Sequence, residues 1–135
     1  MAKIKVEMYV TVTDEDIDDI MSCALEGGIN YWCDGIKVVG EYLGEYGSEQ
    51  IARGGKLKVH LEEPFDDEDT ETYELDKEKF LKGVEMYIKN PDKPYEIVCF
   101  DTDVDGDLTI DTCMVDADVA DMIIQYALFG EIVFG

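Results

Sequence analysis

Cationic side chains are scarce in this chain of 135 residues, which has 11 Lys and Arg against 33 Asp and Glu and a formal net charge of −22. Arg53 is the only arginine, and neither Lys nor Arg occurs after Lys93. Proteins bind nucleic-acid phosphates largely through Lys and Arg. Direct binding of nucleic acid is therefore nearly excluded.

Long uncharged segments are also missing. The longest, residues 122–130, has nine residues, whereas a membrane-spanning helix needs about 20. Charged and apolar residues alternate near the N-terminus, where a signal peptide would have an apolar segment. The sequence therefore predicts a cytoplasmic protein.

Cysteine and histidine are too few and too widely spaced for the commonest metal and nucleophile sites. Cys23, Cys33, Cys99 and Cys113 include no C-x-x-C pair, although zinc sites usually have closely spaced ligands. Because Cys23, Cys99 and Cys113 lie in predicted regular structure, we expect them to be reduced and to pack as small apolar residues. His60, the only histidine, is expected on the exposed side of a strand. No acid–base pair, nucleophile arrangement or phosphate loop is identifiable, and we expect no enzymatic activity.

Hydrophobic residues make up 46% of the chain, enough to form a core in a domain of this length. Period-two alternation or short apolar runs predict strands at residues 4–12, 29–39, 57–61, 73–75, 95–100 and 108–113. The second of these is interrupted near Asp34 and Gly35. The third and fourth are expected to form a hairpin, and Asp105-Gly106 is a turn signal between the last two.

Helices are predicted where an N-capping residue precedes apolar residues at helical spacing. They begin after Thr13, Asp76 and Asp116, and a short helix is predicted at 48–52. The residues expected to face the core are Ile17, Ile20, Met21, Ala24, Leu25, Phe80, Leu81, Val84, Tyr87, Ile88, Val119, Met122, Ile123, Tyr126 and Ala127. Strands and helices mix without strict alternation, which favours a single α+β domain over residues 1–135, with a mainly antiparallel sheet and about three helices packed on it.

Acidic residues are concentrated in three segments. These are the start of the first predicted helix (14–19), residues 62–78 with ten acidic residues in seventeen positions, and the alternating run 101–107. A net charge of about 2 to 8 is sufficient to keep a small domain soluble, and a larger one destabilises the folded state by self-repulsion. The excess suggests an unusual solvent or a basic partner, and ten lysines fit a halophilic cytosol poorly.

The spacing of the carboxylates makes a basic partner more concrete. Alternate residues of an extended strand are roughly 6.6 Å apart, and acidic residues at i, i+3 and i+4 of a helix are about 5–6 Å apart. Both distances resemble the repeat of phosphates along a nucleic acid, so such a surface could occupy a basic cleft that binds DNA. We therefore predict DNA mimicry, with an acidic surface without mimicry as the alternative.

The residues predicted to bind the partner are acidic residues of these three segments and one aromatic residue. They are Asp14, Glu15, Asp18, Asp19, Asp66, Asp67, Glu68, Asp69, Asp101, Asp103, Asp105, Asp107 and Trp32. Exposed Trp residues often anchor protein interfaces. The alternative for Trp32 is a place in the core, where most aromatic residues on strands belong.

Residues 101–108 also resemble a calcium-binding loop. An EF-hand loop has Asp at positions 1, 3 and 5, Gly at 6 and an apolar residue at 8, and all of these match. Position 12 is Thr112, which cannot supply the bidentate carboxylate, and a strand rather than a helix precedes the loop. The loop is therefore either an Asp-rich hairpin turn or a calcium-binding or regulatory module with Asp101, Asp103 and Asp105 as ligands.

Three segments carry a resemblance to a known group of proteins: 24–33 (ALEGGINYWC), 48–55 (SEQIARGG) and 123–135 (IIQYALFGEIVFG). They resemble small acidic proteins of prophages and conjugative elements of gut bacteria, among which anti-CRISPR inhibitors of Cas9-type nucleases occur. The resemblance implies an anti-defence role in the host bacterial cytosol. Its target would be a CRISPR nuclease or a restriction enzyme with a basic DNA channel.

Overall fold

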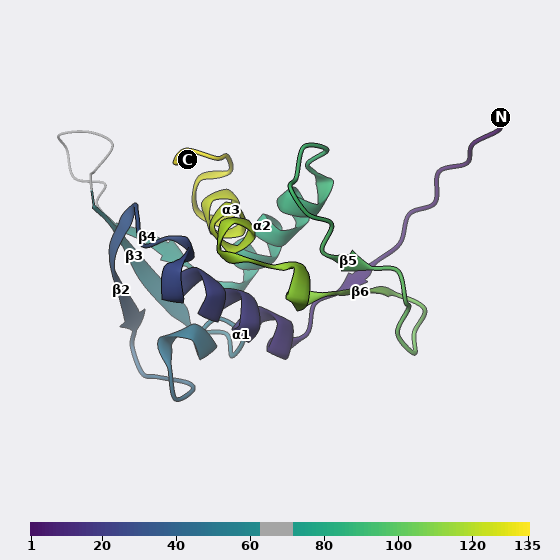
Figure 1. Cartoon of the computed structure of the whole chain (residues 1–135). Coiled ribbons are helices and arrows are strands. Elements are labelled where there is room, and N and C mark those ends of the chain that lie inside the picture. The colour runs from purple at the N-terminus through teal and green to yellow at the C-terminus, as the bar shows by residue number, and fades with distance from the viewer. Residues whose placement is uncertain (63–71) are drawn as a thin grey trace.

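The chain folds into a single α+β domain, and side-chain caps begin the three α-helices of its described residues (Figure 1). The computed structural model describes residues 1–62 and 72–135. The helices are α1 (Asp14–Cys23), α2 (Lys77–Lys89) and α3 (Ala117–Phe129). Thr13, Asp76 and Asp116 each accept a hydrogen bond from the backbone N–H three positions later. These bonds satisfy N–H groups that a helix start leaves unpaired, and they confirm the three predicted helix starts.

The larger sheet is antiparallel, and its strand order is β2-β3-β4. Its strands are β2 (Cys33–Val39), β3 (Lys56–Leu61) and β4 (Thr72–Leu75). Val59 lies opposite Ile36 on one side and Tyr73 on the other, which confirms the predicted hairpin. A bulge falls between Cys33 and Gly35, where the sequence predicts an interruption. The strand predicted at 29–39 begins four residues late, because a turn follows α1.

The smaller sheet has the strand order β1-β6-β5 and includes a parallel pair. Its strands are β1 (Val10–Thr11), β5 (Val98–Cys99) and β6 (Leu108–Ile110). The strand predicted at 4–12 is wrong in extent, because in the described chain β1 pairs with β6 at two positions and nothing pairs with residues 4–8. The predictions at 95–100 and 108–113 are also too long, since Thr112–Met114 forms a 3-10 turn, η3. Alternation indicates that a segment can form a strand, whereas pairing needs a neighbour.

Short helical turns and two glycines shape the connections between the helices. The π-helical turn η1 (Ala24–Gly28) extends α1, and the 3-10 turn η2 (Gly47–Glu49) lies near the short helix predicted at 48–52. A Cβ atom on Gly28 would lie 2.8 Å from the carbonyl oxygen of Ala117, and one on Gly83 would collide with the backbone of α3 at Ile123. These glycines therefore allow η1 and α2 to approach α3 closely.

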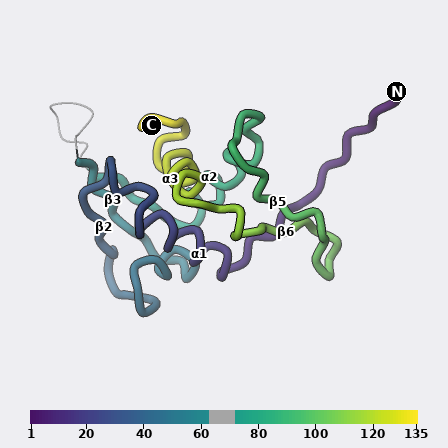
Figure 2. Tube along the Cα trace, in the orientation of Figure 1, coloured from purple at the N-terminus to yellow at the C-terminus, as the bar shows by residue number. Residues whose placement is uncertain are grey.

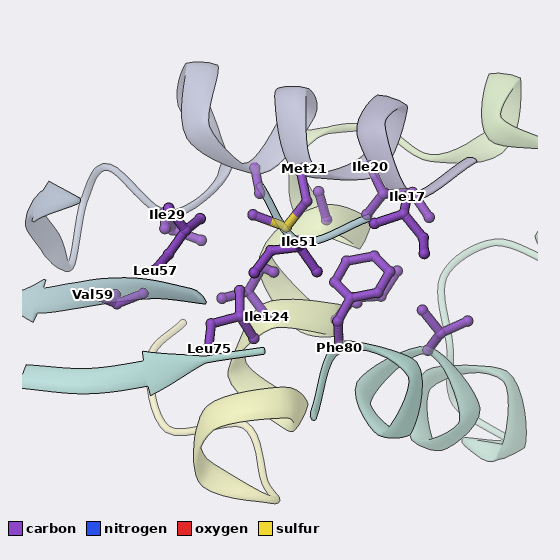
Figure 3. Packing of buried hydrophobic residues seen from close by; sticks show 14 of the residues in the cluster. Ile17, Ile20, Met21, Ile29, Ile51, Leu57, Val59, Leu75, Phe80 and Ile124 are labelled. Carbon is purple, nitrogen blue, oxygen red and sulfur yellow. The ribbon is translucent and has the colours of Figure 1, made fainter. Parts of the chain in front are cut away.

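The core lies between α1 and the β3–β4 hairpin (Figure 3). Figure 3 labels fully buried residues from all sides of it: Ile17, Ile20, Met21, Ile29, Ile51, Leu57, Val59, Leu75, Phe80 and Ile124. Phe80 on α2 and Ile124 on α3 fill the space between the sheet and α1. Burial of one such side chain contributes about 1.5–3 kcal/mol, so this cluster is the main source of stability.

Several predicted core residues are less buried than expected. Leu81 is 37% exposed, so its prediction as an inward residue is wrong. Those that are only partly buried are Leu25, Ile88, Met122, Tyr126 and Ala127. In α3 the polar residues Asp121 and Gln125 are buried instead. Helical periodicity predicts which residues share a face, whereas the neighbouring elements determine how far that face is covered.

Candidate functional site

Two of the predicted acidic segments are brought together by the fold. The Thr11 hydroxyl donates a hydrogen bond to Asp103 Oδ2 at 2.7 Å. The Thr112 hydroxyl donates to Asp19 Oδ2 at 3.4 Å. The start of α1 and the β5–β6 turn therefore lie on the same side of the molecule (Figure 1), although these partners are 92 and 93 residues apart in the sequence.

The β5–β6 turn is held in place by one of its own carboxylates. Asp103 Oδ1 accepts hydrogen bonds from the backbone N–H groups of Asp105 (2.9 Å) and Asp107 (3.0 Å). The Asp103 backbone N–H also donates to the Asp107 carbonyl, and Gly106 has the left-handed φ of +84° that the turn requires. The hydrogen bond from Thr11, followed by those from the backbone N–H groups, lowers the pKa of Asp103 below its ordinary value. The predicted hairpin turn is confirmed.

The carboxylates at the start of α1 divide into two groups. Asp14 lies 3.3 Å from the amino group of Lys77, and Asp18 lies 3.6 Å from the guanidinium of Arg53. Burial raises the pKa of Asp18, although the charge of Arg53 opposes this effect. These two predicted partner-binding residues therefore already have cationic neighbours within the chain.

The other carboxylates of α1 and the β5–β6 turn that the sequence predicted to bind a partner, together with Asp111, form what we call the acidic region. It consists of Glu15, Asp19, Asp101, Asp103, Asp105, Asp107 and Asp111. Within the described residues, none of them forms an ion pair with Lys, Arg or His. Glu15, Asp19, Asp101, Asp105 and Asp111 are exposed, whereas Asp103 and Asp107 are half-buried. The sequence pattern identified most of these residues, but not that the β5–β6 turn is bonded to Thr11 just before α1, or that Asp19 is bonded to Thr112.

The third predicted acidic cluster cannot be placed relative to this region. Asp66, Asp67, Glu68 and Asp69 lie outside the residues that the structure describes. Their role in partner binding stays a prediction from the sequence.

Trp32 does not face a partner. Its side chain is 3% exposed, and its ring stacks on Phe134 at a centroid distance of 5.2 Å. The ring also meets Phe129 edge-on at 5.6 Å. The interface-anchor prediction for Trp32 is therefore wrong, because α3 and the C-terminal residues cover the indole, and the core alternative holds.

A buried polar cluster that the sequence analysis missed surrounds Trp32. Asp121 Oδ1 accepts hydrogen bonds from Trp32 Nε1 (2.7 Å) and Gln125 Nε2 (2.9 Å), and Asp121 Oδ2 accepts one from the Tyr31 hydroxyl (2.5 Å). Burial and the bond to Asp121 raise the pKa of Tyr31. Gln125 Oε1 accepts from two backbone N–H groups of the C-terminal segment 133–134. The sequence signal for this cluster was the pair Asp121 and Gln125, two polar residues four positions apart on the otherwise apolar side of α3.

Asp103, one of the three predicted calcium ligands, is used to hold the β5–β6 turn in place. Both carboxylate oxygens of Asp103 accept hydrogen bonds from the protein. In the described part of the chain, no three His, Cys, Asp or Glu side chains are grouped so that they could hold a metal ion. Calcium binding by Asp101, Asp103 and Asp105 stays a prediction.

His60 lies on the exposed side of β3, as predicted, whereas one of the cysteines differs from its prediction. Cys113 is exposed and Cys33 is buried, so the prediction that Cys113 packs as an apolar residue is wrong. Burial raises the pKa values of Cys23 and Cys33. His60 lies on the open face of the larger sheet, where its Nδ1 is 2.5 Å from Asp34 Oδ1.

Comparisons with known proteins identified no relative of this chain. No protein-family model matches the chain, and neither a curated protein nor a solved structure matches it. Among the described residues, the helices are too short or too polar to span a membrane.

Proposed function

We propose that this protein is a non-catalytic inhibitor of a nucleic-acid-cutting defence enzyme, such as a Cas nuclease or a restriction enzyme. In this proposal the acidic region enters the enzyme's basic nucleic-acid cleft and excludes DNA. One observation carries the proposal: the fold bonds Asp103 of the β5–β6 turn to Thr11, just before α1, and Asp19 of α1 to Thr112, and in the described chain no cation forms an ion pair with a carboxylate of the acidic region.

The local geometry supports such a role. Asp103 fixes the β5–β6 turn through its own hydrogen bonds, so the exposed carboxylates of Asp101 and Asp105 are held on a preorganised loop. A preorganised surface loses little conformational entropy on binding. Carboxylates that enter a basic cleft also release the counterions of that cleft, much as DNA phosphates release theirs.

The proposal is tested by binding and cleavage assays with guide-loaded Cas9-type nucleases and restriction enzymes. We expect the chain to compete with DNA for at least one of them and to bind quickly, with an affinity that falls steeply as salt rises. An affinity that stays constant between about 0.05 M and 0.5 M salt would contradict the proposal, because screening must weaken a charge-driven contact over that range.

A matched pair of variants tests which carboxylates act. The triple variant Asp101→Asn, Asp105→Asn and Asp107→Asn removes three charges from the acidic region, and we expect it to weaken binding at least about tenfold. The control Glu74→Gln, Glu85→Gln and Glu96→Gln removes three charges that lie beside Lys56, Lys82, Lys89 and Lys93. Equal losses of affinity in both variants would show that only net charge matters and would contradict a role for the acidic region.

A further inference from the structure

The N-terminal segment 3–9, which we call the arm, runs away from the rest of the molecule (Figure 2). Its even-numbered residues are apolar and exposed: Ile4 by 88%, Val6 by 68% and Met8 by 49%. Lys5 and Glu7 lie on the opposite side, 3.8 Å apart, and each side chain is 87% exposed. The arm therefore has one apolar face and one charged face, as a half-buried strand would.

Most of the backbone of the arm has no partner in the described chain, and the exception is the Tyr9 carbonyl, which accepts a hydrogen bond from the Leu108 N–H. No backbone hydrogen bond involves residues 3–8 there, and the arm leads directly into β1, which forms an edge of the smaller sheet. An exposed strand edge is a template on which another extended chain can pair.

A groove lies where the arm joins the body. It has a volume of about 770 Å³, and its apolar lining comes from Met8, Val10 and Val12 on one side and from Leu81, Val84 and Ile88 of α2 on the other. The even-numbered face of the arm thus continues the apolar wall that begins in the core. Helical periodicity places Leu81 inward, but its side chain is exposed because it lines this groove and nothing in the described chain closes the groove.

We infer that the arms of two copies of this chain pair as antiparallel strands, with Val6 opposite Val6 of the second copy. In this register Ile4 lies opposite Met8, and Lys5 lies opposite Glu7 of the other copy. Two opposite-charge pairs and a continuous apolar row result, and cross-strand pairs of these kinds stabilise antiparallel strands.

Neighbouring registers lose these contacts. A shift of the pairing centre to residue 5 places Lys3 opposite Glu7 but also Lys5 opposite Lys5. A shift to residue 7 places Glu7 opposite Glu7 and forms no opposite-charge pair within the arm, so only the register centred on Val6 has opposite-charge pairs without a like-charge pair. A centre between two residues turns the two apolar faces to opposite sides of the ribbon. The arm is therefore self-complementary in charge and in apolar pattern in one register.

Charge also favours a second copy as the occupant. The arm carries Lys3 and Lys5 against Glu7, whereas the chain as a whole has a net charge of −22. Two arms therefore meet without the repulsion that two acidic regions would produce. This inference is independent of the proposed inhibitory function.

Sedimentation velocity of the whole chain tests the association. We expect a dimer at about 100 μM protein, and we expect Lys5→Glu to raise the dimer dissociation constant at least about tenfold, because it turns two favourable pairs into two like-charge pairs. Adding Glu7→Lys to Lys5→Glu restores opposite charges and should restore the dimer. A chain that is monomeric throughout, or a double variant that is no better than Lys5→Glu, would overturn the inference.

Disulfide cross-linking tests the register separately. In a Cys113→Ser background, which removes the exposed cysteine, Val6→Cys should form a covalent dimer on oxidation, because directly opposed Cβ atoms are about 4.5–5.5 Å apart. Met8→Cys is the control, since its two copies would be about 13 Å apart in this register. Equal cross-linking of the two variants would contradict the register. Both substitutions lie outside the core, so thermal melting should confirm that each variant is folded.

Discussion

Two regions of this molecule differ in whether their carboxylates lie beside cationic side chains. Around α2 they lie beside lysines: Glu85 contacts Lys82 at 3.4 Å and Lys89 at 2.7 Å, and Lys56 lies 3.1 Å from Glu74. Between α1 and the β5–β6 turn, the carboxylates of the acidic region have no such neighbour in the described chain.

The difference teaches that the large negative charge is not distributed for solubility alone. A soluble domain could place its lysines among all its acidic residues. Here the last 42 residues contain no Lys or Arg, and the fold brings Asp19 of α1, which has no cationic neighbour in the described chain, to Thr112 in this cation-free part. Repulsion is therefore concentrated in one region, where carboxylates are held by hydrogen bonds from neutral groups instead of by cations.

The largest effect is expected at Asp121, the most deeply buried carboxylate of the cation-free part. Asp121→Ala removes the acceptor of the Tyr31 hydroxyl and of Trp32 Nε1, and it removes one acceptor of the Gln125 amide, which also donates to the Phe134 carbonyl. We expect the free energy of unfolding to fall by about 2–4 kcal/mol, because buried donors would lose their partners. Chemical denaturation monitored by Trp32 fluorescence measures this change.

Asp118→Ala provides the control for Asp121. It removes an exposed carboxylate from the same helix, and we expect a change of about 0.5 kcal/mol or less from its interaction with the helix dipole. Similar losses in the two variants would contradict the role of the buried cluster.

Substitution of Asp103 is expected to cause a smaller loss of thermal stability, and this loss should depend on pH. Asp103→Asn keeps an acceptor for the turn but cannot accept the Thr11 hydrogen bond with a second carboxylate oxygen. We expect the melting temperature at pH 7 to fall by a few degrees. The native pKa is lowered, so the carboxylate contributes stability above its ordinary pKa near 3.8 and loses that contribution as pH falls through the lower native value.

The Asp103→Asn difference should therefore shrink below about pH 4. Asp105→Asn is the control, because the Asp105 carboxylate is exposed and accepts no hydrogen bond from the described residues. A melting difference for Asp103→Asn that stays constant down to about pH 2 would show that the carboxylate charge does not matter.

The smallest effect is expected in the lysine-bearing region. Hydrogen bonds from Lys89 and then Lys82 lower the pKa of Glu85, but the pairs are exposed and screened by solvent. We expect Glu85→Gln to leave the melting temperature unchanged within error, since exposed ion pairs contribute little. A clear loss of stability would show that neutralisation around α2 is structural, and would weaken the contrast between the two regions.

Local sequence signals were sufficient for much of the fold. Thr13, Asp76 and Asp116 begin the helices because an N-cap needs only a side-chain oxygen and the backbone next to it. The β3–β4 hairpin and the interruption of β2 near Gly35, which is a bulge, were predicted because alternation and glycine act over a few residues.

Non-local contacts account for the errors. Residues 4–9 alternate as well as those of any strand, yet only β1 has a neighbour with which it can pair. Trp32 was open to two interpretations until Asp121 and Phe134, about 90 and 100 residues later, were seen to surround it. The sequence predicted every carboxylate of the acidic region except Asp111, but not the division into ion-paired and cation-free carboxylates.

Composition and local pattern alone determined the strong negative charge, the helix starts and the presence of an α+β core, because these depend on residue types and on neighbours along the chain. Tertiary structure decided which carboxylates lie beside Lys77 and Arg53 and which gather with the β5–β6 turn. Electrostatic interactions weaken over a Debye length of about 8 Å. The electrostatic environment of a carboxylate is therefore determined by the side chains that the fold brings near it, whatever their separation in sequence.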